Sequence, residues 1–411
     1  MKKIAIFTGC LLLMSVVACT AGDPKKENTS GPVTDTLPPV ETSKPNTNYS
    51  PAFKGQTRIN GMKTKTPFTG KVLTDKLSRP WGMTALPDGR LLITQKAGTM
   101  VIVSATGKVS DPITGIPGVN SKGQGGLLGI TLDPEFSNNR MVYWVFSEST
   151  PDGNLTAVAK GRLANNEKTI ENAQIIYRAT PAHNSNLHYG GRILFDKDGY
   201  LFVSTGERSD IQTRPQAQQL NSALGKVLRI TKEGKPAPGN PFENKPEDHP
   251  EIWSYGHRNV QGLAINPVTR DLWGSEFGPL GGDEINLIMP GKNYGWPTIT
   301  YGLEYSGATI GNGITQKEGM EQPVYYWDPV ISPSGMVFCS SANIPEWKNN
   351  LFVCGLSGQH IARLRIENNR VTGEERILSK EGQRFRDIIQ GKDGNLYTVT
   401  DQGRLYKLEK K

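Results

Sequence analysis

The chain has little histidine and cysteine, and its apolar runs are short. Only 5 histidines and 4 cysteines occur among 411 residues. No two histidines have His-x-His or His-x-x-x-His spacing, so a zinc site is not expected. The apolar run from Ile4 to Val17 is too short to span a bilayer. No basic run with interleaved aromatic residues is present, so nothing in the sequence favours a nucleic-acid partner.

Long helical patterns are also missing. No helical segment of ordinary length separates the apolar segments, which argues against alternating strands and helices around a parallel sheet. The 46 glycines and 28 prolines exceed average usage, and both residues are unfavourable in helices. This composition predicts many short strands joined by turns. The net charge of +8 suits an anionic small ligand as well as a nucleic acid and does not decide between them.

The first residues are typical of a secretory signal, with two lysines before an apolar stretch. The sequence Val16-Val17-Ala18-Cys19 resembles the lipobox of bacterial lipoproteins. That resemblance implies removal of residues 1–18 and diacylation of Cys19, and two acyl chains anchor a protein stably. The alternative is an ordinary secretory signal in which Cys19 is incidental. We therefore expect a lipid-anchored protein of the bacterial cell envelope, facing the periplasm or the surface, with this anchor as its only membrane contact.

Residues 19–60 contain six prolines and few large apolar residues, which predicts a lipidated, disordered tether. No second linker follows, so residues 61–411 are expected to form one domain. Beyond the signal only Cys339 and Cys354 remain, on two predicted strands of one hairpin. An oxidising compartment permits a disulfide, but a simple register places Cys339 opposite Leu351. A bridge and two free buried thiols both stay open.

One local pattern recurs six times, a turn rich in Asp, Asn or Gly followed by a short apolar strand. The apolar strands lie at residues 90–94, 141–144, 200–204, 272–275, 351–354 and 395–399. Strands repeated at intervals of about 60 residues are typical of propeller blades. The sequence therefore predicts an all-β fold, a six-bladed β-propeller, with a β-sandwich as the alternative. Ligands of such a fold bind at one mouth of the central channel, between loops from several blades.

Three glycine-rich segments carry candidate site residues. Gln124 lies within Gly123–Gly129, where small residues let a backbone approach a ligand, although a tight turn explains the glycines equally well. His188 precedes paired glycines and an apolar strand, and is a candidate general base, with a structural hydrogen bond as the alternative. Arg258 and Asn259 can together bind a carboxylate or a quinone oxygen.

Two further segments suggest a cation and an anion site. The loop at 275–297 offers carbonyl and carboxylate oxygens, which suit Ca²⁺, although it lacks EF-hand spacing and can equally be a rigid loop with solvated acids. Arg384 and Arg386 alternate on a predicted strand and so point the same way, as an anion site or an exposed basic edge. A small multi-carboxylate cofactor held by arginines and a hard cation satisfies all of these segments.

Four long stretches resemble one enzyme family: HYGGRILFDKDGYLFVSTGE, SYGHRNVQGLAINP, SEFGPLGGDEINLIMPGKNYGWP and WDPVISPSGMVF. They are similar to soluble pyrroloquinoline quinone-dependent glucose dehydrogenases, most of all to the aldose sugar dehydrogenase branch of the glucose/sorbosone dehydrogenase family. The similarity runs from about Thr66 to the C-terminus. It implies a six-bladed propeller that oxidises aldoses at the anomeric carbon to lactones and passes the electrons to an external acceptor, which the sequence does not identify.

The resemblance also implies residue roles. His188 would take the proton from the anomeric hydroxyl while a hydride passes to pyrroloquinoline quinone, and Arg258 would act beside it. Contacts to the cofactor are implied for Gln124, Arg258, Asn259, Tyr305, Arg384 and Arg386. The carbonyls of Gly278 and Pro279 would bind a Ca²⁺ that polarises the quinone. Glu284 and the carbonyl of Tyr294 would bind a second, structural Ca²⁺.

Three departures from the family pattern weaken the catalytic interpretation. Phe277 replaces a polar residue, Leu187 replaces an acid that would orient the base, and Ser357-Gly358 replaces a lysine that contacts the cofactor. Phe277 and the missing lysine favour the alternative of a non-catalytic, calcium-stabilised propeller that binds sugars or protein partners. A propeller lactonase would need a metal held by side-chain carboxylates at the channel centre, and no such set is evident.

Overall fold

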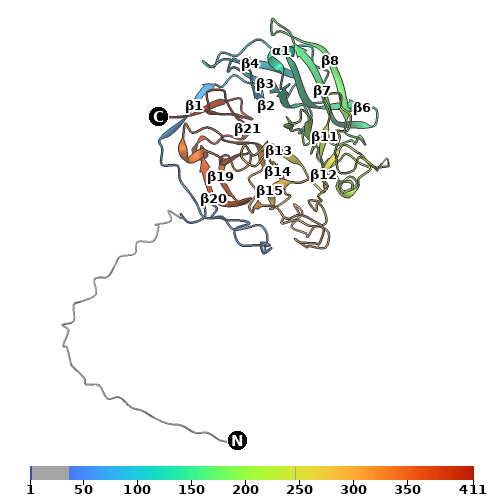
Figure 1. Ribbon diagram of the computed structural model, residues 1–411, viewed down its shortest axis with the longest axis vertical. Helices are drawn as coiled ribbons and strands as arrows, with labels where there is room; N and C mark the ends of the chain where they lie inside the picture. The colour runs from blue at the N-terminus through green and yellow to red at the C-terminus, as the bar shows by residue number, and fades with distance from the viewer. Residues whose placement is uncertain (2–36, 246) are drawn as a thin grey trace, which may run out of the picture. The chain divides into compact units, whose positions relative to one another are not determined.

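Six antiparallel sheets are arranged in a ring in the computed structural model (Figure 1). The structure describes Met1, residues 37–245 and residues 247–411. Within these residues the only α-helix is the four-residue α1 (Phe136–Asn139), with 3-10 turns at Arg214–Gln218, Pro345–Trp347 and Ser379–Glu381. The predicted six-bladed β-propeller is therefore confirmed. In this described part of the chain, no helix is long and apolar enough to cross a bilayer.

The blades follow one another along the chain, and all but the first have four strands. Blades one to three consist of β2 (Pro80–Ala85), β3 (Leu91–Gln95) and β4 (Thr99–Val103); β5 (Leu127–Leu132), β6 (Met141–Thr150), β7 (Gly153–Leu163) and β8 (Ile170–Arg178); and β9 (Ile193–Phe195), β10 (Leu201–Ser204), β11 (Lys226–Ile230) and β12 (Ile252–Tyr255). Blades four to six consist of β13 (Val260–Ile265), β14 (Leu272–Glu276), β15 (Asp283–Ile288) and β16 (Tyr325–Trp327); β17 (Pro333–Phe338), β18 (Leu351–Gly355), β19 (Ile361–Glu367) and β20 (Arg370–Ile377); and β21 (Phe385–Gln390), β22 (Leu396–Thr400), β23 (Leu405–Lys410) and β1 (Phe68–Thr74).

The six repeated apolar segments are the second strands of the six blades, namely β3, β6, β10, β14, β18 and β22. The turns before them explain the repeated Asp and Gly. Before β10, the Asp196 carboxylate accepts the backbone N–H groups of Asp198 and Tyr200, and Gly199 adopts a φ of 81°. A positive φ favours glycine, and a short carboxylate side chain stabilises such a turn. The second strand itself is buried on both faces, which explains its unbroken apolar run.

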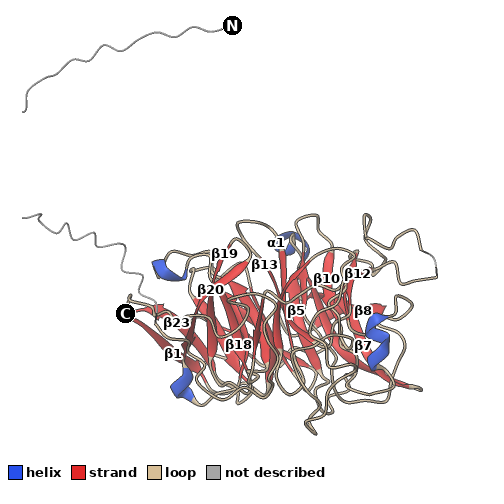
Figure 2. Ribbon diagram, turned by 90° about the horizontal axis from the view of Figure 1, so that it is seen from below, coloured by secondary structure: helices blue, strands red, loops and turns tan. Residues whose placement is uncertain are grey.

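The ring is closed by pairing the two ends of the domain in one sheet. Strand β1 pairs with β23, so that Phe68 lies opposite Lys410. Large side chains fill the space between neighbouring blades: Trp144 of blade two packs with Leu92 and Met100 of blade one. Trp273 of blade four meets Phe338 of blade five edge to face, with ring centroids 5.9 Å apart. The core therefore lies between the blades, and Figure 2 shows the sheets from the side with loops at both ends.

The first strand of every blade lies on the inside of the ring, and these inner strands neighbour one another in order: β2, β5, β9, β13, β17 and β21. Because all six run in the same direction through the ring, the segments that precede them gather at one end of the channel. This arrangement brings residues from distant parts of the sequence to one mouth.

Residues 37–60 do not form the predicted tether. The backbone N–H groups of Asn46 and Thr47 donate to the carboxylate of Asp328, at 2.8 and 3.0 Å. Gln56 is fully buried and donates to the carbonyl of Pro323. This segment is fixed by polar side chains that satisfy its backbone, which its low apolar content could not reveal. The predicted boundary at residue 60 is therefore wrong, and residues 2–36, with the signal and Cys19, lie outside the described residues.

Cys339 and Cys354 are both buried free thiols. The predicted hairpin is present as β17 and β18, but its register differs from the simple one by a residue. Phe338 lies opposite Leu351, and the Cys339 N–H donates to the carbonyl of Asn350. Burial raises the pKa of both thiols.

Candidate active site

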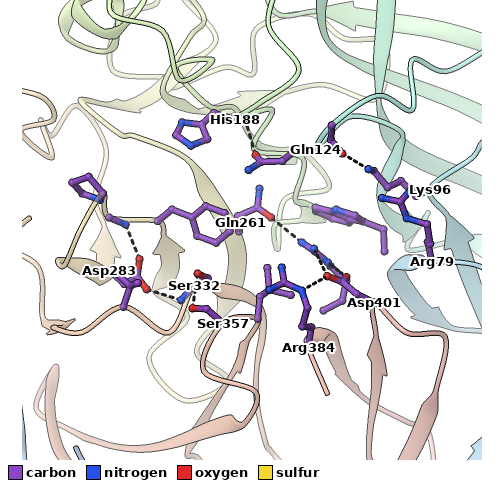
Figure 3. A pocket seen from close by; sticks show the side chains of 18 of the residues that line it. Arg79, Lys96, Gln124, His188, Gln261, Asp283, Ser332, Ser357, Arg384 and Asp401 are labelled. Carbon is purple, nitrogen blue, oxygen red and sulfur yellow. Dashed lines mark hydrogen bonds and ion pairs between the residues drawn. The ribbon is translucent and has the colours of Figure 1, made fainter. Parts of the chain in front are cut away.

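A cavity of about 550 Å³ opens where the inner strands begin (Figure 3). Every blade contributes to its wall through residues at or near the start of its inner strand: Trp81, Gln124, His188, Gln261, Ser332 and Arg386. A hollow of this size suits a small-molecule ligand. Of the residues singled out from the sequence, Gln124, His188, Gly278, Pro279, Tyr305, Arg384 and Arg386 line it.

His188 is held at two points. Its backbone has a φ of 46°, and its N–H donates to Oε1 of Gln124 at 2.9 Å. Its ring Nδ1 lies 2.5 Å from Oε1 of Glu207, and both side chains are buried. A carboxylate at Nδ1 selects the tautomer with hydrogen on that nitrogen and leaves the Nε2 lone pair free.

The surroundings of His188 keep its ring neutral. Burial, followed by the positive charge of Arg258, lowers the pKa of His188 to about 4, against the opposing effect of Glu207. At neutral pH the imidazole can therefore accept a proton at Nε2. Leu187 has no acidic group, and its side chain is partly exposed to solvent. Glu207 therefore supplies the acid that orients His188. Glu207 follows β10 at the same mouth as His188, but an isolated acid after a strand is too common to mark a site in the sequence.

Arg384 and Arg386 lie side by side on the cavity wall and share one carboxylate. Arg384 Nε donates to Asp401 at 3.0 Å, and Arg386 donates to it twice, at 2.8 and 3.0 Å. Burial would raise the pKa of Asp401, but the two arginines outweigh it and hold the pKa below its usual range. One acid shared between two guanidinium groups leaves a net positive charge, so the pair still suits an anionic ligand.

Arg258 and Asn259 lie beside the cavity. Arg258 donates to the carbonyl of Gly278 at 2.8 Å and packs over the ring of Trp296. It borders a small pocket that shares Phe277, Gly278 and Pro279 with the main cavity, and it does not line the main cavity itself. Asn259 accepts the Gly190 N–H, and its buried Nδ2 has no hydrogen-bond partner among the described residues.

The small pocket also contains a buried pair of acids. Glu276 of β14 and Glu284 of β15 lie opposite each other, and the Asn286 amide donates to both carboxylates. Burial, followed by repulsion from Glu276, raises the pKa of Glu284. Two carboxylates this close favour a proton or a cation between them, and Glu276 also lies 2.9 Å from Nδ1 of the buried His257. Tyr294 borders the same pocket. No group of three or more His, Cys, Asp or Glu side chains able to hold a metal occurs in the described part of the chain, so a cation here would also need carbonyl oxygens.

Asp283 fixes the loop that carries Gly278. Its carboxylate accepts the backbone N–H groups of Gly278, Ile331 and Ser332, each at 2.7 Å. Burial raises the pKa of Asp283 to about 7, although the three amides stabilise the charged form. Blades four and five are thereby joined at the cavity wall.

The remaining predicted residues lie at the edge or the wall of the cavity. Tyr305 is 72% exposed on the rim. Ser357 contributes only a hydroxyl, hydrogen-bonded to Ser332 at 2.7 Å. Positive charge comes instead from blade one, where Arg79 and Lys96 line the cavity. Sequence reasoning missed both, because neither lies in a glycine-rich segment. It also missed Gln261, which donates to the Gly190 carbonyl at 3.0 Å.

Comparison with known families settles the relationship. The family model for glucose/sorbosone dehydrogenase matches residues 77–407, almost the whole propeller. The chain belongs to the glucose/sorbosone dehydrogenase family. As a member of this dehydrogenase family, it is an oxidoreductase.

Individual proteins of this kind match the chain in sequence or structure over most of its length. It is 41% identical to the aldose sugar dehydrogenase YliI of Escherichia coli (strain K12), over 82% of this chain and 92% of that protein. The apo crystal structure of soluble aldose sugar dehydrogenase from Escherichia coli matches at 40% identity with a TM-score of 0.79, covering 83% and 99% of the two chains. A PQQ-bound aldose sugar dehydrogenase from Streptomyces coelicolor matches at 31% identity with a TM-score of 0.69, covering 84% and 99%.

Proposed function

We propose that this protein is a pyrroloquinoline quinone-dependent aldose sugar dehydrogenase that oxidises sugars at the anomeric carbon to lactones. The observation that carries the proposal is the buried His188–Glu207 pair. His188, whose Nε2 is free, lines a cavity that arginines also line. A neutral, oriented imidazole is suited to remove a hydroxyl proton. The similarity to aldose sugar dehydrogenases supports the substrate class.

The residues present fit the proposed cofactor. It is a tricarboxylate quinone, and the cavity offers Arg79, Lys96, Arg384 and Arg386 against two acids, the shared Asp401 and Asp283, whose pKa burial raises to about 7. The unpartnered Nδ2 of Asn259, in the described part of the chain, is a donor without an acceptor beside this wall. When bound, pyrroloquinoline quinone would supply the acceptor for one hydride, which carries both electrons of the oxidation.

The residues also fit Ca²⁺, because the donors on the loop are hard oxygens. Gly278 and Pro279 line both pockets, and the Glu276–Glu284 pair adds two carboxylates, of which only Glu276 has an ion-pair partner among the described residues, His257 at 2.9 Å. Gly278 and Pro279 would hold one ion, and Glu284 with the Tyr294 carbonyl would hold a second. The first ion would act as a Lewis acid toward a quinone oxygen.

In this mechanism the residues of the chain bind and orient the ligands and move one proton. His188 Nε2 accepts the proton of the anomeric hydroxyl as hydride leaves the same carbon, so that no alkoxide accumulates. Glu207 holds Nδ1–H and stabilises the imidazolium that forms. Arg384 and Arg386 position the anionic ligand, and the exposed Tyr305 at the rim supports a broad range of sugars.

One reconstitution experiment tests the proposal. Residues 37–411, with Ca²⁺ and pyrroloquinoline quinone added, should reduce a redox dye in the presence of aldoses, and omission of either addition should abolish the reduction. A wild-type protein that binds the quinone tightly but oxidises no aldose would favour the non-catalytic propeller. A protein that does not bind the quinone would overturn the proposal.

We also propose that Cys19 anchors the enzyme to a membrane of the cell envelope. The lipobox-like sequence supports this, and Cys19 lies outside the described residues. Expression with radiolabelled palmitate should label the wild-type chain and leave Cys19→Ser unlabelled. A wild-type chain without label would contradict the anchor.

A further inference from the structure

Arg79 and Lys96 are cross-strand neighbours at the cavity end of blade one. Pro80 of β2 pairs with Gln95 of β3, and the two basic residues extend this pairing by one position. The Lys96 N–H donates to the Arg79 carbonyl at 3.1 Å. Both side chains line the cavity, on the side where Asp401 also lies (Figure 3). Two cations from one hairpin end therefore face the same space.

These two cations lack the neutralisation that the other basic residues have. Arg384 and Arg386 share Asp401, whereas Arg79 and Lys96 form no ion pair with any described carboxylate. Lys96 as a whole residue is 8% exposed, and its ammonium donates to the carbonyl of Gly123. Burial, followed by repulsion from Arg79 and Arg386, lowers the pKa of Lys96 to about 8. A largely buried ammonium without a counter-ion is unfavourable unless a ligand supplies the negative charge.

The contact to Gly123 links this pair to the proposed base. Gly123 directly precedes Gln124, whose side chain accepts the backbone N–H of His188. An anion bound at Lys96 would therefore lie on the wall next to Gln124.

We propose that Arg79 and Lys96 form a carboxylate-binding site on blade one, separate from the Arg384–Arg386 pair. The inference rests on the proposed function, because its ligand is either a carboxylate of the cofactor or that of an acidic sugar. A planar guanidinium beside an ammonium suits a carboxylate, with one hydrogen-bonded contact from each.

The first arm of the test measures cofactor affinity without turnover. Trp81 lines the cavity, so pyrroloquinoline quinone can be titrated against tryptophan fluorescence in excess Ca²⁺. We expect Lys96→Gln and Arg79→Gln each to raise the Kd about tenfold, equivalent to about 1.4 kcal/mol. Lys96→Arg should stay within about threefold because it keeps the charge. Lys392→Gln removes the same charge outside this cavity and serves as the matched control.

The second arm distinguishes the two sources of the carboxylate. If Lys96→Gln leaves the Kd unchanged but raises the KM for glucuronate about tenfold, with glucose unaffected, the site takes a sugar carboxylate. If both Gln variants keep the wild-type Kd, KM and melting temperature, this inference is overturned and the proposed function is unaffected. Failure of the wild-type chain to bind the quinone would overturn the proposed function and this inference together.

Discussion

The propeller has hollows at both ends of its inner strands, and they are nearly equal in size. The cavity at the starts of these strands has a volume of about 550 Å³, and the one at their other ends about 560 Å³. The first contains the His188–Glu207 pair and four cations. The second is lined mainly by apolar residues, including Met83, Ile130, Leu194, Leu263, Met336 and Ile388. Volume alone does not distinguish them, so the chemistry must come from the loops.

Buried charge lies at the inner end of the second hollow. Arg192 and Asp387 form an ion pair at 2.8 Å and line this hollow, and Arg192 also donates to the Gln261 backbone carbonyl. The Arg192 guanidinium packs over Trp81, which lines the first hollow. The inner strands thus carry a structural ion pair near one end and the proposed catalytic residues at the other. Substitutions at the two ends should accordingly change different properties.

The largest expected effect is on the proposed base. His188→Gln should lower kcat/KM for aldoses by about 10³-fold, within the range of general-base contributions, with little change in cofactor affinity. His183→Gln is the matched control, because His183 pairs with Asp210 and does not line the cavity. Dye-reduction kinetics check both variants. Full activity in His188→Gln would remove His188 from the mechanism.

The ion pair between the hollows should affect stability. Asp387→Asn leaves Arg192 buried without its counter-charge, and breaking such a pair costs about 3–5 kcal/mol. The exposed pair of Arg162 and Glu171 is the control, and Glu171→Gln should cost less than about 1 kcal/mol. Urea unfolding of the cofactor-free chain measures both. Equal stabilities for the two variants would show that the inner pair is not structural.

The comparison of the two ends also explains which features the sequence could predict. The number of blades could be predicted because every blade has a turn before its second strand. That turn and strand leave the same local pattern in the sequence six times. Gln124 and His188 were found because glycine-rich segments precede inner strands at the site end. A hard cation and an anionic cofactor were suggested by the residues, whereas the identity of the cofactor and most individual roles came from resemblance, and the calcium sites and roles stay predictions.

Other residues could not be found because no local pattern marks them. Glu207 and Asp401 act through partners that the fold brings near, and an isolated acid after a strand is common. Lys96 gains its importance from burial, which its neighbours in sequence do not indicate. The segment at 37–60 is fixed by distant acids such as Asp328, whereas composition registers only its shortage of apolar residues.

A smaller effect is expected from the acid that orients the base. Glu207 raises the pKa of His188, so Glu207→Gln should make the imidazole less basic and lower kcat by about 10- to 100-fold. In the wild type, kcat/KM should fall only as the pH drops through about 4, where His188 becomes protonated. In the variant this acidic limb should move to lower pH. A limb that stays in place would assign it to another group.

The smallest effect is expected at the second hollow. Lys392 lines it, together with Arg192 and Asp387, whose charges neutralise each other. Lys392→Gln should therefore change the Kd for pyrroloquinoline quinone and kcat/KM by less than about twofold, because one unpaired cation cannot compensate a multi-carboxylate ligand for its lost hydration. Calorimetric titration should accordingly find one quinone bound per chain, despite two hollows of the same volume. A second equivalent that disappears in Lys392→Gln would show that the second end of the channel is also a binding site.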